Sequence, residues 1–187
     1  NQFVYNGRRY FRVGCAEKGP CRFKVTTHGA AGHASMPRLG ENALLKLAPL
    51  IEKLAGRQPD YDLTAEPRAI LTALMGKDPG ENPSQAELEE MLAEVRAVDE
   101  RLFALLEPTM GVSMTPTIVK ASEKINVIPD TASVWVDCRV PPGHGAELAE
   151  QRAREMLGDG DYKIKFSEAA IGNGSPHDTK LMDLIKD

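Results

Sequence analysis

One short segment of the chain sets two histidines among very small side chains, and it is the part of the sequence best suited to chemistry. It runs from His28 to Pro37 and reads HGAAGHASMP. Glycine and alanine let a backbone approach another surface closely, and they leave the imidazole of His33 unshielded and able to donate a hydrogen bond. From these residues alone, a ligand-contacting histidine and an ordinary surface loop are equally well supported.

Metal binding within the chain is not expected. The remaining histidines, His144 and His177, are far from this segment in sequence, and a metal site needs three or four converging ligands. Pro176, His177 and Asp178 read instead as a turn with a helix cap at Asp178. The sequence also lacks the HExxH, GxSxG, GxGxxG and Walker A patterns. No complete active site is therefore predicted.

Composition narrows the classes of protein further. Of the 187 residues, 42% are hydrophobic, which is enough to bury the core of a domain. Lys and Arg total 23 against 27 Asp and Glu, a net charge of −4, so no overall positive field would attract nucleic acid or anionic lipid. No apolar run is long enough to cross a membrane, and no export signal is evident. We expect a cytoplasmic protein.

The cysteines give little indication of a site. Cys15, Cys21 and Cys138 are odd in number and contain no CxxC pair, which predicts neither a disulfide framework nor a zinc knuckle. One alternative function uses Cys15 or Cys21 as a nucleophile with a histidine as its base. It needs a depressed thiol pKa and an adjacent base, and the sequence indicates neither.

The elements that must position these residues alternate between strand and helix patterns. We expect strands at 22–27, 115–127, 131–140 and 162–166, with helices at 41–55 and 144–157. Strands 115–127 and 131–140 should form a hairpin with a tight turn at residues 128–130. The order predicts an α+β fold, a ferredoxin-like β-α-β-β-α-β four-stranded antiparallel sheet with two helices on one face. The first helix is expected to bury Leu44, Leu47, Ala48, Ile51 and Leu54.

Two stretches lie outside this pattern. Residues 57–112 read as a helical insertion, in which a capping box at Ser84–Glu87 opens one long amphipathic helix. Its predicted apolar side comprises Leu88, Met91, Leu92, Val95, Val98, Leu102 and Leu105. Residues 3–11 read as a β-hairpin turning at Asn6 and Gly7, which should belong to a sheet whose other strands lie elsewhere.

The second and fourth strands of a ferredoxin-like sheet lie at its edges. Pro116 suits an edge, because proline cannot donate to a central ladder. An unprotected edge at residues 117–125 then favours pairing with another chain. We therefore predict a homodimer formed through an edge strand.

A series of short motifs carries a family resemblance. In order, they are Ala16–Gly19 (AEKG), Gly32–Pro37 (GHASMP) with Asn42-Ala43, Lys124–Pro129 (KINVIP) and Asp137–Arg139 (DCR). The series resembles the dimerisation, or lid, domain of the zinc-dependent aminoacylases, acetylornithine deacetylases, succinyl-diaminopimelate desuccinylases and carnosinases. The resemblance covers residues 17–172, including the insertion. It implies that residues 1–16 and 173–187 are remnants of a catalytic domain.

The resemblance also implies a function. In that family a catalytic domain holds two zinc ions and a general base that cleave an amide or peptide bond. None of those ligands is in this chain, so the fragment alone is expected to be inactive. By resemblance, His33 stabilises the transition state in the partner subunit's active site, while Asn126 and Arg139 bind a small acylated amino acid or peptide. Arginine suits a carboxylate because its planar fork donates two parallel hydrogen bonds.

Spacing restricts how these residues can act together. On the predicted hairpin, Asn126 and Arg139 stand roughly 20 Å apart at 3.3 Å per residue. By resemblance, His33 and Asn126 serve the partner's site while Arg139 serves its own, which a two-fold interface allows. Without the resemblance, Arg139 reads as a solvated residue paired with Asp137, on the same sheet face as Trp135.

The runner-up function is a free-standing ferredoxin-like regulatory or ligand-binding module, because that fold serves many unrelated functions. The unpaired hairpin near the start of the sequence and the turn-rich tail after Gly172 argue against it.

Overall fold

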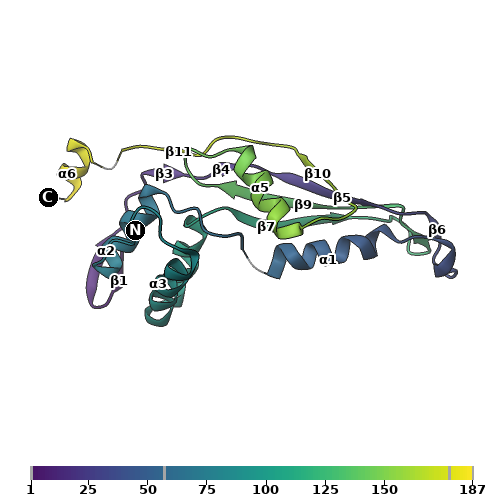
Figure 1. Ribbon diagram of the computed structural model, residues 1–187, viewed down its shortest axis with the longest axis horizontal. Coiled ribbons are helices and arrows are strands. Elements are labelled where there is room, and N and C mark those ends of the chain that lie inside the picture. Colours follow the sequence, from purple (N-terminus) through teal and green to yellow (C-terminus); the bar gives the residue numbers. More distant parts are fainter. Residues whose placement is uncertain (1, 57, 177, 187) are drawn as a thin grey trace.

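The computed structural model describes residues 2–56, 58–176 and 178–186. It is an elongated α+β molecule (Figure 1). A central sheet runs along its length, with helices against one side of the sheet, a group of helices at one end and a narrow projection at the other. The α+β class expected from the sequence is confirmed.

The central sheet is antiparallel throughout. Its strands are β10 (Lys163–Phe166), β5 (Phe23–His28), β9 (Thr131–Val140) and β7 (Ser113–Lys120), paired in that order. The short β4 (Gly19–Pro20) pairs with β9 beyond the start of β5. Strands β7 and β10 therefore form the two edges, and Pro116 lies on the edge strand β7, where the register shifts.

Two helices cover one face of this sheet. They are α1 (Ala43–Gly56) and α5 (Ala146–Leu157), and both contact β9. Strand β9 alternates as a half-covered strand should: Val134, Val136 and Cys138 are buried, whereas Trp135 and Asp137 are partly exposed on the helix-free face. The main core thus lies between this sheet and these two helices.

The buried side of α1 differs from the predicted stripe. Leu47 and Leu54 are buried as expected, but Leu44 and Ala48 are exposed, and Leu50 is buried in their place. Because α1 packs against β5, β9 and β7, its burial follows the sheet surface rather than the stripe read from the sequence. Helix α1 extends to Gly56, one residue beyond the predicted end.

The projection, which we call the tip (residues 29–42 and 121–130), contains a second small ladder. Strand β6 (Gly32–His33) pairs with β8 (Val127–Ile128). The antiparallel pairing of the predicted hairpin is confirmed, because β7 pairs with β9, but the tight turn is wrong: β7 ends at Lys120, and the chain leaves the central sheet until β9 begins at Thr131. Residues 126–130 instead accept backbone hydrogen bonds from the segment that leads into α1, which lies beside them: Ala34 N–H donates to Asn126, Ala43 N–H to Pro129 and Gly29 N–H to Asp130.

At the opposite end, the described part of the predicted insertion, residues 58–112, forms a helical unit of α2 (Ala65–Met75), α3 (Gln85–Val98) and α4 (Glu100–Leu106). The capping box at Ser84 and Glu87 is confirmed. The single long helix is wrong, because Asp99 takes an extended conformation and its side chain accepts a hydrogen bond from Leu102 N–H, capping a new helix. The break leaves Val98 exposed.

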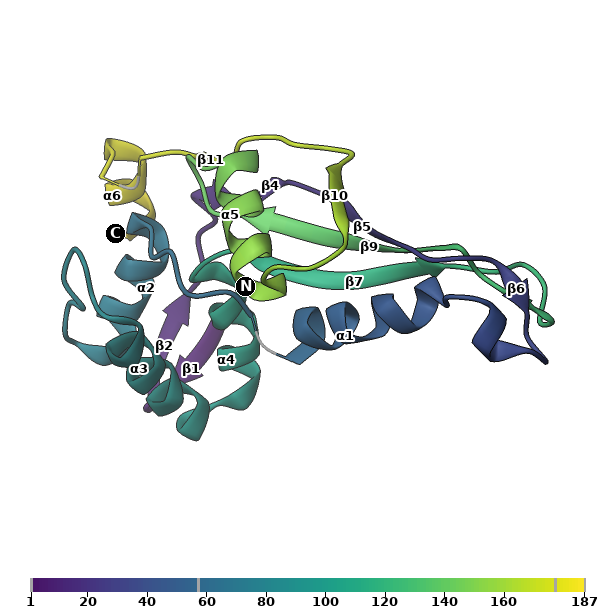
Figure 2. The ribbon, with the colours of Figure 1, turned by 45° about the vertical axis from the view of Figure 1, so that its right-hand side comes forward.

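The N-terminal hairpin packs on this helical unit. Strands β1 (Gln2–Tyr5) and β2 (Arg8–Phe11) turn at Asn6 and Gly7, both with positive φ, as predicted. Within the described residues, these strands pair only with each other, and they lie beside the helices in both views (Figures 1 and 2). Tyr5 is buried there, and Tyr10 Oη donates to the carbonyl of Ala73. Hairpin and helices thus share a second hydrophobic core.

Two short strands pair the segment before the central sheet with the segment after it. Strand β3 (Ala16–Glu17) pairs with β11 (Asn173–Gly174), and α6 (Lys180–Lys186) follows. The helix cap predicted at Asp178 is at Thr179 instead, whose Oγ1 accepts from Met182 N–H at 3.3 Å. The turn predicted at His177 lies outside the described residues. The domain boundaries at residues 16 and 172 stay predictions.

Candidate functional site

His33 is exposed on β6, and its ring has a defined hydrogen-bonding state. The backbone N–H of Ser35 donates to Nδ1 at 3.2 Å, and Ser35 Oγ lies 2.8 Å from the same nitrogen. A ring nitrogen that accepts a hydrogen bond carries no proton, so in the neutral ring the proton is on Nε2. In the neutral ring, Nε2–H is therefore left as the donor.

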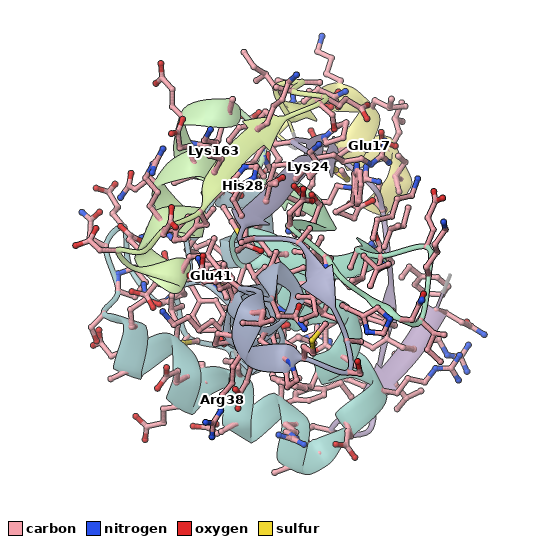
Figure 3. All side chains as sticks on the ribbon, turned by 90° about the vertical axis from the view of Figure 1, so that its right-hand side faces the viewer. Glu17, Lys24, His28, Arg38, Glu41 and Lys163 are labelled. Atoms are coloured by element: carbon pink, nitrogen blue, oxygen red, sulfur yellow. The ribbon has the colours of Figure 1, made fainter. Side chains whose placement is uncertain are left out.

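The tip is held by backbone contacts at two glycines. A Cβ on Gly29 would lie 2.0 Å from the carbonyl oxygen of Glu41, and one on Gly32 would lie 3.2 Å from Cα of Gly40. At Gly29 only glycine permits such close approach, whereas a Cβ at Gly32 would require its neighbour to move by a few tenths of an ångström. Figure 3 views the molecule from the tip end, with Glu41 below His28. The small residues singled out in the sequence thus bring two loop segments together.

Asn126 lies next to His33 at the tip. The N–H of Ala34 donates to the carbonyl of Asn126 at 3.0 Å, and His33 is the register partner of Val127. Asn126 is exposed. The structure therefore brings two of the three predicted site residues side by side.

Arg139 lies at the other end of β9, which we call the base (residues 16–22, 113–115 and 137–140). Its Nε donates to Asp137 Oδ1 at 2.7 Å and its Nη2 to Oδ2 at 3.2 Å, so the two side chains form a forked pair. About a third of each side chain is exposed: 37% for Arg139 and 33% for Asp137. Hydrogen bonds from Arg139, and then from Arg22, lower the pKa of the Asp137 carboxyl, so the pair stays ionised.

A second arginine also bonds to Asp137. Arg22 Nε donates to Asp137 Oδ2 at 3.2 Å, and its Nη1 bonds to Glu168. Arg22 precedes β5 and shares the parity of Lys24 and Thr26 on the helix-free face. Arg22 is not among the residues predicted from the sequence, although the alternation of that strand could have placed it on the face of Arg139.

Lys18 belongs to the first of the family motifs, and its side chain makes two hydrogen bonds at the base. Its Nζ donates to the carbonyl of Pro108 at 2.7 Å and to Ser113 Oγ at 2.9 Å, and Ser113 is the register partner of Arg139. Burial lowers the pKa of Lys18 to about 8. Lys18 thus fastens the end of the helical unit to the base.

The cysteine hypothesis finds no support at Cys21. Its thiol is buried in the main core, and burial raises its pKa. Burial likewise raises the pKa of Cys138 to about 12. A nucleophilic thiol needs the opposite shift.

Among residues 2–56, 58–176 and 178–186, no group of three or more His, Cys, Asp or Glu side chains could hold a metal ion. In the same part of the chain, no helix is long and apolar enough to cross a membrane.

The sequence pattern of the M20 peptidase dimerisation domain matches residues 15–165, which is most of the chain. The chain therefore belongs to the peptidase dimerisation domain family, the lid-domain class that its motifs resembled. This confirms the family predicted from the sequence.

Curated relatives extend beyond this domain. The chain is 29% identical over 161 residues to a probable carboxypeptidase S-like 2 of Dictyostelium discoideum, covering 81% of this chain and 29% of the relative. It is 25% identical over 183 residues to a probable succinyl-diaminopimelate desuccinylase of Staphylococcus aureus, covering 92% of this chain and 39% of the relative. The chain thus spans less than two fifths of the length of either.

Solved structures share the fold. The chain aligns with the di-peptidase Dug1p of Saccharomyces cerevisiae with a TM-score of 0.58 at 13% identity, covering 90% of this chain and 39% of that one. For human carnosine dipeptidase 1 the TM-score is 0.53 at 12% identity, with coverages of 89% and 40%. At these identities the likeness supports the fold alone.

Proposed function

We propose that this chain is the dimerisation and substrate-capping domain of a metal-dependent hydrolase that cleaves amide or peptide bonds. In this proposal His33 stabilises the transition state in the partner subunit's site, and Asn126 and Arg139 bind substrate. The observation that carries the proposal is an exposed imidazole at the end of a projecting loop, whose Nδ1 accepts from Ser35 N–H and whose Nε2 has no partner among the residues that the structure describes.

A donor of this kind suits an oxyanion. When the carbonyl of an amide is attacked, negative charge develops on its oxygen, and a fixed N–H aimed at that oxygen lowers the barrier by about 2.7–4 kcal/mol. The Ser35 contacts hold the ring of His33, so little ordering is needed when the substrate arrives. His33 would act as a hydrogen-bond donor and not as a metal ligand.

The separation of tip and base favours action across two subunits. Strand β9 runs from Thr131 at the tip to Arg139 at the base, roughly 26 Å at 3.3 Å per residue. One small substrate cannot contact both ends of a single chain. A two-fold dimer removes the conflict if each site takes Arg139 from its own subunit and His33 with Asn126 from its partner.

Strand β7 is the edge that we propose for dimerisation, and we interpret the order β10-β5-β9-β7 as the ferredoxin-like arrangement predicted above. Apolar side chains are exposed along β7 and the adjoining helix α1: Ile118 is 52% exposed, Val119 49% and Leu45 70%. An edge ladder beside an apolar helix face gives a second copy both backbone pairing and area to bury.

Zinc enters this proposal only through the rest of the enzyme. The described residues offer no cluster that fits a metal, so two ions, as the resemblance implies, would be held by a catalytic domain beyond this chain. Bound there, they would activate water for attack on the amide. This chain's residues would orient the substrate carboxylate at Arg139 and donate to the developing oxyanion at His33.

Subunit mixing of the full-length enzyme tests this proposal. His33→Ala and Arg139→Met should each be nearly inactive alone. In a mixed dimer, one site combines Arg139 of its own subunit with His33 of its partner, so re-equilibrated mixtures should regain about a quarter of wild-type activity with random pairing.

The outcomes of the mixing experiment are distinct. No recovery in mixtures that light scattering shows to be dimeric would mean that His33 acts within its own subunit. A monomeric wild-type enzyme with full activity would overturn the proposed use of the β7 edge. Ile118→Asp should convert the dimer to monomers and abolish turnover together.

A further inference from the structure

Asp137 is the shared acceptor of two arginines at the base. Arg139 bonds to it through Nε and Nη2, and Arg22 bonds to its Oδ2 through Nε. Arg22 itself is held on its other side by Glu168. The four side chains thus form one row of alternating charge, Arg139, Asp137, Arg22 and Glu168, in which each inner member has two partners.

Asp137 leaves part of the Arg139 guanidinium unused. Arginine has five N–H donors in a planar fork, and Asp137 engages Nε and Nη2, so the Nη1 donors remain for another acceptor. The direction of those donors depends on where the carboxylate of Asp137 points. A rotation of that carboxylate would turn the guanidinium plane with it.

Arg22 limits this rotation from the neighbouring strand. The N–H of Cys21 donates to the carbonyl of Cys138 at 2.8 Å, so the residue after Cys21 and the residue before Cys138 stand across from each other. The backbone therefore fixes the place from which Arg22 reaches Asp137. Glu168, in the segment after β10, restrains the other end of the guanidinium.

The outer pair of this row is well exposed to solvent. The side chain of Arg22 is 42% exposed and that of Glu168 45%. Exposed ion pairs contribute little to stability, because water screens them and two long side chains lose freedom when they pair. A forked pair within a network of several charges is an exception that adds to stability, and the same bonds fix the direction in which each side chain points.

We infer that Arg22 is a positioning residue for substrate carboxylate binding: through Asp137 it orients Arg139 so that the free Nη1 edge meets the carboxylate. This inference rests on the proposed function, since it takes Arg139 to be the carboxylate-binding residue. Arg22 does not touch the substrate. It determines how strongly the enzyme distinguishes a free carboxylate from a neutral group.

The test compares a carboxylate substrate with its neutral amide analogue in the full-length enzyme. From a panel of N-acyl amino acids and dipeptides, the best substrate is measured beside the same compound with its terminal carboxylate converted to an amide. Arg22→Met should raise KM for the carboxylate substrate about tenfold, the lower end of the loss caused by removing an orienting partner at metal sites, with kcat nearly unchanged. The values of kcat and KM for the amide should be unaffected. The preference of the enzyme for the carboxylate over the amide should therefore fall.

Further variants separate the possible outcomes. Arg22→Lys keeps the charge but not the fork and should restore discrimination only in part. Arg154→Met, which removes an ion-paired arginine on the exposed side of α5, is the matched control and should change nothing. If Arg139→Met leaves discrimination intact, or no panel member is cleaved, the proposed function fails. If Arg139→Met abolishes discrimination and Arg22→Met preserves it, only the role of Arg22 is wrong.

Discussion

The two ends of the central sheet are held in place by different interactions. At the tip, backbone atoms bond to backbone atoms: Ala30 N–H donates to the Glu41 carbonyl at 2.8 Å, and Gly29 N–H to that of Asp130 at 2.7 Å. At the base, charged side chains bond in addition to the backbone ladder, with Lys18 and Arg139 each making two hydrogen bonds.

The tip and the base are suited to different tasks. The tip holds its backbone rigidly but leaves the side chains of His33 and Asn126 exposed, which suits groups that must reach into a surface supplied from elsewhere. The base surrounds Arg139 with charged groups of the same chain, which suits a group whose direction must be set in advance. We therefore expect the function of the tip to depend on steric fit, and that of the base to depend on charged side chains.

The largest effect is expected at the tip. His33→Ala should lower kcat of the full-length enzyme about 10²–10³-fold, the usual cost of losing one oxyanion donor. The melting temperature should stay the same, because the ring is exposed and bonds only within its own loop. His28→Ala, an exposed histidine on the adjoining strand, is the control; equal losses from both variants would contradict the role of His33.

Gly29→Ala tests the steric side of the comparison. The new methyl group would lie 2.0 Å from the Glu41 carbonyl oxygen, so one of the two segments must move. Such overpacking costs about 1–3 kcal/mol, and it should also lower kcat by displacing β6. Gly14→Ala, where no atom lies within 4 Å, should be neutral in denaturation and kinetics. A fully active, fully stable Gly29→Ala enzyme would show that the close approach is dispensable.

The smallest effect concerns pH at the base. The pKa of Lys18 is about 8 in the folded chain and ordinarily 10.5, so the unfolded chain binds more protons between these values. The free energy of unfolding should therefore rise with pH across this window, by at most about 1.4 kcal/mol per pH unit for one proton. The cost of burying the charged amine is fully present below pH 8.

Thermal denaturation of the wild type and Lys18→Met at pH 7 to 10 measures this contribution. The difference between the two melting temperatures should shift in favour of the wild type above pH 8, because titration of all other groups cancels. A constant difference over the whole range would mean that Lys18 keeps its ordinary pKa.

Much of this arrangement could be predicted from the sequence where the signal is local. The alternation in β9, the Asn6-Gly7 turn and the capping box at Ser84 each depend on residues that are neighbours in the chain. The motifs also identified His33, Asn126 and Arg139, whose roles stay predictions.

The features that were missed depend on contacts distant in sequence. Strands β6 and β8 are two residues long, too short to show a periodicity, and form because the tip segments meet in space. Asp99 fits a helix interior on pattern and breaks it by capping the next helix. Arg22 acquires its importance from Asp137 and Glu168, 115 and 146 residues away.

The helical unit leaves the central domain and returns to it at nearly the same point. Asp62 N–H donates to the Met110 carbonyl at 2.9 Å, and Gln58 Oε1 accepts from Met114 N–H at 3.1 Å. Because its two ends are joined side by side, this segment can grow, shrink or vary without altering the length or register of β9. Evolution can therefore change the bulk beside the base while the spacing between His33 and Arg139 stays constant.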